Sequence, residues 1–178
     1  SVINDEINRI NEIVSEFLIL GKPTAQKTDI IDMRTIITEL DPLILSEAAL
    51  NKVNYESFIP EKPIFVDYIK DQMKQVLLNL TKNSFEAMAE GDHLSITLDH
   101  SQSQCHIKIS DTGSGIPEEE LDKIFQPFYT SKDTGTGLGL VICKRIIESF
   151  DGEISVSSSE RKGTVVNIFL PAQISKKM

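Results

Sequence analysis

The first part of the chain carries an apolar residue at alternating intervals of four and three positions. These residues are Ile3, Ile7, Ile10, Val14 and Phe17. The spacing is that of a helix packing along a seam, and Ile13, Leu18 and Leu20 widen the stripe to the breadth typical of a helical bundle. Gly21 and Pro23 are typical of a helix end. We therefore predict a helix over residues 1–22, either folded onto its own domain or forming half of a hairpin, and a linker over residues 23–27.

Helical and strand-like patterns then mix over residues 28–174, the predicted extent of one domain, with a short tail at 175–178. Helices are predicted at 33–50, 66–89 and 138–150. Strands are predicted at 51–58, 63–67, 94–98, 105–109, 153–158 and 164–170. Because helices and strands do not alternate strictly, their order favours an α+β fold, a two-layer sandwich with helices on one face of a mixed β-sheet.

Composition narrows the classes of protein to which this domain can belong. The 178 residues hold 27 Asp plus Glu against 18 Lys plus Arg, a formal net charge of −9, which argues against a nucleic-acid partner. An anionic ligand would need local geometry or a bound cation to attract it. Two cysteines are too few for a disulfide framework, and no apolar run reaches the roughly 18 residues of a membrane span, so a cytoplasmic location is expected.

The long predicted helix carries a row of polar side chains along one edge of its apolar face. Asn79, Asn83 and Glu86 follow the i, i+4, i+7 spacing of a single helix edge. Asparagine is a mediocre helix former, and an amide oxygen suits a Mg²⁺ ion that keeps several waters and bridges phosphates. The row is therefore either an ordinary polar edge or part of a ligand site.

A second candidate follows the predicted strand at 105–109, in the run Asp111 to Pro117. Parity along the strand places Asp111 on the same face as the apolar residues before it, so its carboxylate points toward the core. A buried acid needs a hydrogen-bonding partner, and Gly113 and Gly115 allow a flat ligand to approach the backbone. The alternative is a loop in which the acid caps a turn.

A third candidate, the glycine-rich run 135–140, opens an apolar helix. Oriented amides at a helix start can bind an anion, but the run lacks the Lys of a P-loop and no strand leads directly into it. Just before it, residues 124–132 hold Phe125, Phe128 and Tyr129, which either belong to the core or anchor a mobile lid.

Taken in this order and spacing, the motifs resemble the N, G1, F and G2 boxes of the ATP-binding domain of sensor histidine kinases. This Bergerat-type fold also occurs in gyrase-like ATPases. The matching segments are 75–88, 111–115, 125–128 and 135–140, and the resemblance covers about residues 28–172. The amino-acid sequence of these boxes is most similar to that of the sporulation-kinase and nitrogen-regulator subgroup.

The resemblance implies a role for each matched position. Asn83 would hold Mg²⁺ and Asn79 would support the phosphates or the metal, which makes these two the expected catalytic residues. Asp111 would accept a hydrogen bond from the exocyclic amine of adenine, with Thr164 helping through water. The other expected ATP contacts are Lys82, Gly113, Gly115, Lys132, Gly135, Thr136, Gly137, Leu138 and Gly139.

One position narrows the class of reaction that the domain is expected to catalyse. In the gyrase-type hydrolases of this fold, the residue one turn before the metal asparagine is a glutamate that activates water. Asn79 occupies that position here and cannot act as a base, which favours transfer of the γ-phosphoryl group to a nucleophile such as imidazole. The alternatives are a serine kinase of the anti-sigma type and a scaffold that binds nucleotide without transferring phosphate.

The chain departs from the family in lacking the acceptor-histidine box. His93, His100 and His106 fall on predicted strands or turns, without the acidic and Arg-Asn-Pro neighbours of that box. Residues 1–22 then match the second helix of the dimerisation hairpin, and we expect the remainder of the kinase to lie upstream, with membrane attachment there left open. The partners implied are that hairpin within a homodimer, a response regulator that receives the phosphoryl group on an aspartate, and a protein inhibitor.

Overall fold

The computed structural model describes residues 7, 10, 11, 14, 27–101, 103–131 and 135–173. The strands are β1 (Asp29–Asp32), β2 (Asn54–Phe58), β3 (Phe65–Tyr68), β4 (His93–Ser101), β5 (Gln104–Asp111), β6 (Glu153–Ser159) and β7 (Gly163–Gln173). The helices are α2 (Met33–Leu50), α3 (Lys70–Ala87), α4 (Glu118–Leu121) and α5 (Gly139–Glu148).

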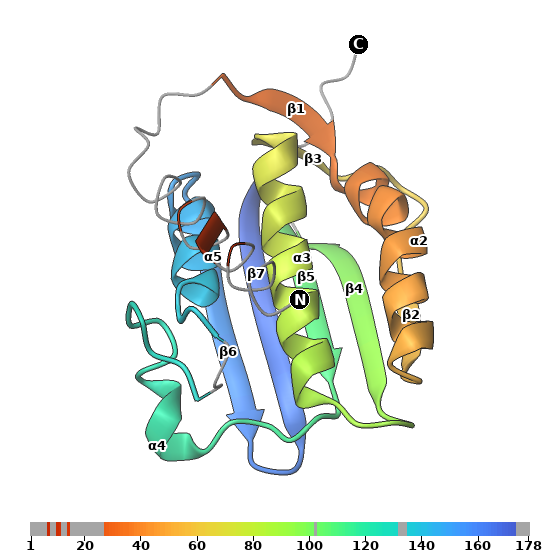
Figure 1. Cartoon of the computed structure of the whole chain (residues 1–178). Coiled ribbons are helices and arrows are strands. Elements are labelled where there is room, and N and C mark those ends of the chain that lie inside the picture. Colours follow the sequence, from red (N-terminus) through yellow and green to blue (C-terminus); the bar gives the residue numbers. More distant parts are fainter. Residues whose placement is uncertain are drawn as a thin grey trace.

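The strands form one sheet in the order β1-β3-β7-β5-β4-β2, and β6 pairs with β7 off this path. The β2–β4 pair is parallel and the other pairs are antiparallel, so the sheet is mixed. Helices α2, α3 and α5 lie across one face of it (Figure 1). The predicted α+β class and two-layer arrangement are confirmed.

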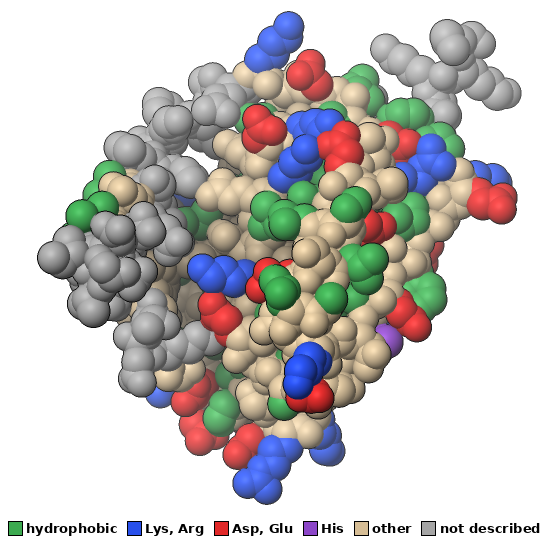
Figure 2. All heavy atoms as spheres, turned by 45° about the vertical axis from the view of Figure 1, so that its right-hand side comes forward, with side chains coloured by type: hydrophobic (Ala, Val, Ile, Leu, Met, Phe, Trp, Pro, Cys, Tyr) green, Lys and Arg blue, Asp and Glu red, His purple; other side chains and the backbone are tan. Residues whose placement is uncertain are grey.

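The core lies between the sheet and these helices. Alternate residues of β4 and β5 are buried there, including Leu94 and Ile107, because strand side chains point to opposite faces in turn. Tyr68 ties β3 to α5 by donating from its hydroxyl to the Ile146 carbonyl at 2.9 Å. On the outer surface, Glu39 of α2 pairs with Lys70 and Lys74 of α3, and Figure 2 shows acidic and basic side chains interspersed over this face.

The prediction that the long helix begins near Val66 is wrong. Val66 lies in β3, opposite Ile31 of β1 and Ala172 of β7, and α3 begins four residues later at Lys70. Val66 and Tyr68 are buried while Asp67 between them is exposed, which is a strand period. Apolar positions 66, 69 and 73 also fit a helix, so the two periods overlap there. The short elements β1 and α4 were not predicted.

The predicted helix at 1–22 lies largely outside the described residues. Ile7, Ile10 and Val14 are described, and each is helical and about half exposed. The boundaries at 1–22, 23–27 and 175–178 therefore stay predictions. Within the part of the chain that the structure describes, no helix has the length and apolar character needed to cross a bilayer.

Candidate functional site

Asp111 is the last residue of β5. Its carboxylate accepts hydrogen bonds from three donors that lie on three separate segments. Its Oδ1 accepts from the Gly113 amide at 3.0 Å and from the Thr164 amide at 3.2 Å. Its Oδ2 accepts from the Ser84 hydroxyl of α3 at 2.9 Å. Asp111 is 6% exposed, which confirms the inward direction that its strand parity predicts. We call Ser84, Asp111, Gly113 and Thr164 the carboxylate cluster.

Two opposing influences act on the pKa of Asp111. Burial raises the pKa because it disfavours the charged form, and the nearby Asp92 carboxylate raises it further. The Gly113, Ser84 and Thr164 donors lower it by stabilising the charged form, but burial dominates and the pKa lies above its usual value. The cluster therefore presents a buried acceptor whose charge depends on the donors around it.

The loop after Asp111 packs tightly against other parts of the protein backbone. A Cβ on Gly113 would lie 2.5 Å from the Ala87 carbonyl oxygen, and one on Gly115, at φ +70°, would lie 2.0 Å from that of Ser159. The Ser114 amide donates to the Ala87 carbonyl, and the Ser114 carbonyl accepts from the Arg161 amide. Packing against the protein itself therefore already requires glycine at both positions, and their predicted role beside a nucleotide stays a prediction.

Two serines that support this loop were not identified from the sequence. Ser84 is 5% exposed, and a small polar residue at a core position of a helix was the available signal. Ser158 of β6 accepts from the Ile116 amide and donates to the Gly163 carbonyl, and its hydroxyl lies 2.8 Å from that of Thr164. Nothing distinguishes Ser158 within the serine-rich run 155–159.

The two asparagines of α3, Asn79 and Asn83, precede Ser84 along the helix and are half-buried. The Asn79 Nδ2 atom is buried without a hydrogen-bond partner among the residues that the structure describes. A buried, unpaired amide donor costs free energy unless an acceptor meets it. Asn79 therefore has a donor available for an oxygen that the protein does not supply. Lys82 and Glu86, on the same helix, are exposed.

The start of α5 lies beside these asparagines. Helices α3 and α5 pack antiparallel (Figure 1), and the Cys143 thiol lies 3.8 Å from the Val76 carbonyl oxygen. Asn79 lies about one turn beyond Val76 and Gly139 about one turn before Cys143, so both are at the same end of the helix pair. We call Asn79, Asn83 and residues 135–139 the amide edge.

The amide edge differs from the carboxylate cluster in having free space beside its backbone. A Cβ on Gly139 would meet no atom of the described residues within 4 Å. The Leu138 amide donates to the Thr136 hydroxyl at 3.3 Å, and Leu138 itself is buried. The first amides of a helix have no helical acceptor, so the start of α5 can receive an anion.

The aromatic run before this loop does not form one cluster. Phe125 packs against the core with the Lys144 ammonium 5.1 Å from its ring centre, whereas Phe128 is 64% exposed at φ +65°. The Phe128 amide donates to the Gly137 carbonyl at 3.0 Å, which joins the run to the glycine-rich loop. Lys132, an expected phosphate contact, lies outside the described residues.

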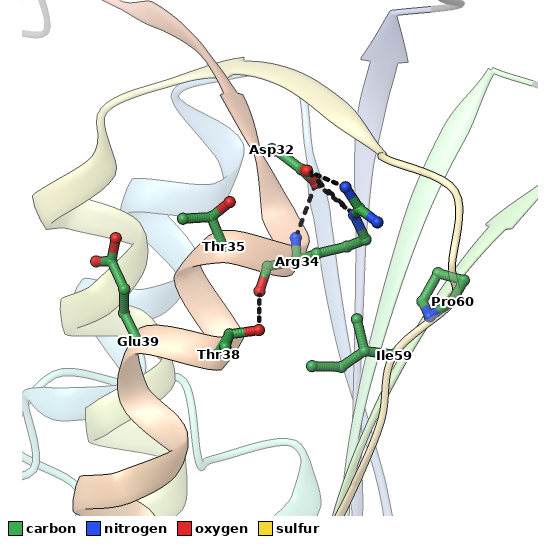
Figure 3. Close-up of a pocket in the computed structure, with 7 residues that line it drawn as sticks. All are labelled: Asp32, Arg34, Thr35, Thr38, Glu39, Ile59 and Pro60. Carbon is green, nitrogen blue, oxygen red and sulfur yellow. Dashed lines mark hydrogen bonds and ion pairs between the residues drawn. The ribbon is translucent and has the colours of Figure 1, made fainter.

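A separate pocket of about 350 Å³ lies between α2 and the β2–β3 connection (Figure 3). Its charged groups are already paired, since Arg34 binds the Asp32 carboxylate and the Glu61 carbonyl, and Glu39 binds two lysines of α3. These lysines lie at the start of α3, whereas Ser84 lies near its end. None of the motif residues lines this pocket, so we place the candidate site at the carboxylate cluster and amide edge instead.

Comparisons with known proteins match the part of the chain that carries these residues. Residues 68–174 match the family described as histidine kinase-, DNA gyrase B-, and HSP90-like ATPases. Sporulation kinase D of Bacillus subtilis (strain 168) is 49% identical over 176 residues, which are 98% of this chain and 35% of that kinase.

Solved structures agree with this match. The nucleotide-free catalytic domain of histidine kinase ThkA is similar with a TM-score of 0.75 at 30% identity, over 82% of this chain and 96% of that one. Histidine kinase ThkA in complex with response regulator protein TrrA is similar with a TM-score of 0.78 at 27% identity, over 97% of this chain and 50% of that one.

Proposed function

The chain belongs to the histidine kinase-, DNA gyrase B- and HSP90-like ATPases and carries a histidine-kinase catalytic domain, and we propose that its candidate site binds Mg²⁺-ATP for phosphoryl transfer to a histidine. The acceptor would be a histidine on the dimerisation hairpin of the kinase, which passes the group to a response-regulator aspartate. The observation that carries this proposal is that the helix with the Ser84 donor to the buried acceptor Asp111 also carries Asn79, whose amide donor has no partner among the described residues.

The adenine base would bind at the carboxylate cluster. Its exocyclic amine needs an acceptor, and Asp111 is an acceptor held in place by three donors. Such an acceptor costs little to reorganise when the ligand arrives. Thr164 donates from its amide to Asp111, and its hydroxyl lies 2.8 Å from that of Ser158, so a polar side chain stands beside the carboxylate, which supports its predicted contribution through water.

The phosphates would bind at the amide edge. The unpaired Asn79 Nδ2 is a donor and so suits a phosphate oxygen, not a metal ion. The amides of 135–139 and the open side of Gly139 suit the same anion, and Lys82 is exposed where it can contribute charge.

Asn83 would hold the Mg²⁺ ion through its amide oxygen. The described residues contain no cluster of three or more His, Cys, Asp or Glu that could form a metal cage. A Mg²⁺ ion bound by one amide oxygen, waters and phosphates fits this donor set, and when bound it would neutralise phosphate charge in a protein with a net charge of −9.

The residues favour a histidine acceptor over water. Asn79 holds the position of the hydrolytic glutamate, and its amide has no basic group to take a proton from water. A neutral imidazole is nucleophilic without a base, so the domain mainly needs to position donor and acceptor and to stabilise charge. His93 and His100 lie in β4 and His106 in β5, so none of the three stands on the hairpin helix on which the acceptor is expected.

Phosphoryl transfer to a supplied hairpin tests the proposal. The chain is incubated with γ-labelled ATP and Mg²⁺, with and without a hairpin that carries the acceptor histidine. We expect acid-labile label on the hairpin histidine and almost none on the chain alone. Strong labelling of His93, His100 or His106 without the hairpin, or ATP binding with no labelling of the hairpin, would contradict it.

The metal role of Asn83 is tested by Asn83→Ala. We expect the variant to lose the Mg²⁺-dependent part of its ATP affinity, as does the wild type after chelation of Mg²⁺, because the amide oxygen for the ion is gone. Titration calorimetry with and without Mg²⁺ measures this. Asn167→Ala is the matched control, since Asn167 lies in β7 with its amide oxygen 2.9 Å from His106 Nε2. An unchanged Mg²⁺ dependence in Asn83→Ala would refute the assignment.

A further inference from the structure

The Ser84 hydroxyl makes an unusual contact for a serine inside a helix. Such a serine commonly points to solvent or bonds a carbonyl on the preceding turn, as Thr81 of the same helix does with the Leu78 carbonyl at 3.1 Å. Ser84 instead donates across to Asp111 Oδ2 on β5 at 2.9 Å, and both side chains are buried. The contact joins the helix that carries Asn79 and Asn83 to the strand that carries the buried carboxylate.

The two oxygens of Asp111 have different partners. Both backbone donors, from Gly113 and Thr164, bond Oδ1, so Ser84 supplies the bond to Oδ2. Without the Ser84 hydroxyl, Oδ2 would be a buried charged oxygen with neither of those amides on it. That loss would favour the protonated form of the carboxyl group.

We propose that Ser84 is a positioning residue whose hydroxyl holds Asp111 Oδ2 as a hydrogen-bond acceptor, and so favours nucleotides with a purine 6-amino group over those with a 6-oxo group. Adenine presents an amine donor at this position and guanine presents a carbonyl acceptor. An ionised carboxylate accepts from the former and repels the latter, whereas a protonated carboxyl can donate to the carbonyl. This inference rests on the proposed function, because it requires the base to meet Asp111.

The surroundings of Asp111 agree with this role. Burial raises the pKa of its carboxyl group, and Asp92, in the turn before β4, adds to that effect through its charge. From the other packed elements, the facing groups are uncharged: Ser84 on α3, the Gly113 amide of the loop, the Thr164 amide on β7 and, one bond further, Ser158 on β6. Ser84 is therefore the side-chain donor that opposes burial here.

The test compares Ser84→Ala with Thr81→Val, which removes a buried hydroxyl one turn earlier that does not touch Asp111. Affinities for Mg²⁺-bound, non-hydrolysable ATP and GTP analogues are measured by titration calorimetry between pH 5 and 8.

We expect Ser84→Ala to lower the preference for the ATP analogue about tenfold, the order expected for one hydrogen bond to a charged group. We also expect its ATP-analogue affinity to decline at a higher pH than in the wild type, because more of Asp111 is protonated as the pH falls. Thr81→Val should keep the wild-type ratio and pH profile.

A double variant separates this role from a merely structural one. If Ser84 acts through the Asp111 charge, Ser84→Ala should change the analogue ratio far less in an Asp111→Asn background than in the wild type. A wild-type ratio and pH profile in Ser84→Ala, with the ATP analogue still bound, would overturn the role of Ser84 and leave the proposed function intact. A wild-type chain that binds neither analogue would overturn both.

Discussion

The carboxylate cluster and the amide edge are adjacent parts of one candidate site, yet they are built in opposite ways. In the carboxylate cluster, both oxygens of Asp111 have protein donors, and Gly113 and Gly115 pack onto the protein backbone. At the amide edge, within the described part of the chain, the Asn79 amide has no partner and the side of Gly139 is open. We therefore expect one end to be formed before a ligand arrives and the other to be completed by the ligand.

This difference suits the two parts of a nucleotide. The base does not change during phosphoryl transfer, so a fixed acceptor can recognise it at low reorganisation cost. The transferred phosphoryl group leaves the nucleotide in each turnover, so the protein groups that would pair with it are expected to be free before binding and after release. Under the proposed function, a site that is closed where the base would bind and open where the phosphates would bind would allow both recognition and turnover.

The largest expected effect is on the free energy of unfolding, when alanine replaces one glycine at each end of the site. Gly115→Ala should destabilise the fold by about 2 kcal/mol or more, because a side chain at that positive φ also collides with the Ser159 carbonyl. Gly139→Ala should change the free energy of unfolding by less than about 0.5 kcal/mol, because Gly139 is the first residue of α5 and its Cβ would meet no atom of the described residues. It should weaken ATP binding, because the Cβ would occupy the open side that is expected to receive phosphate. Denaturant unfolding and titration calorimetry measure both quantities. Equal destabilisation by the two substitutions would remove the distinction between the ends.

A smaller effect, on ATP affinity, is expected from Asp111→Asn, which keeps the shape of the carboxylate and removes its charge. The new amide can still accept through one oxygen but presents NH₂ where the amine of adenine needs an acceptor. We expect ATP affinity to fall about 10- to 100-fold, the equivalent of losing one hydrogen bond to a charged group. Asp122→Asn, at an exposed acid after α4, is the control in the same calorimetric titration. Wild-type ATP affinity in Asp111→Asn would show that the base binds elsewhere.

The smallest effect of these three experiments is expected from Asn79→Ala at the amide edge. Removing a buried amide donor without a partner and replacing asparagine by a better helix former should raise the free energy of unfolding by about 0.5–1 kcal/mol. The same change should weaken ATP binding because a phosphate donor is lost. Thermal unfolding with and without Mg²⁺-ATP measures both effects. A destabilised ligand-free variant would mean that the Asn79 amide is paired within the protein.

The sequence was sufficient for most of the fold and for the motifs of the site. Alternation fixes the buried face of β4 and β5, and with it the inward direction of Asp111. It was insufficient at Val66, where strand and helix periods overlap, and at Ser84, whose partner is on a strand 27 residues away. Contacts between distant segments, such as those of Ser158 and Gly115, depend on the packing of the loop and leave no local pattern to read.

Amide hydrogen exchange, with and without a non-hydrolysable ATP analogue and Mg²⁺, tests the division of the site most directly. The Gly113 and Thr164 amides are bonded to Asp111 in the ligand-free structure, so we predict that they are already protected and change little on binding. The amides of the first turn of α5, from Gly139 to Val141, lack helical acceptors and should slow about tenfold or more when phosphates bind. Protection of Gly113 and Thr164 only after the analogue is added, with no change at 139–141, would contradict the account.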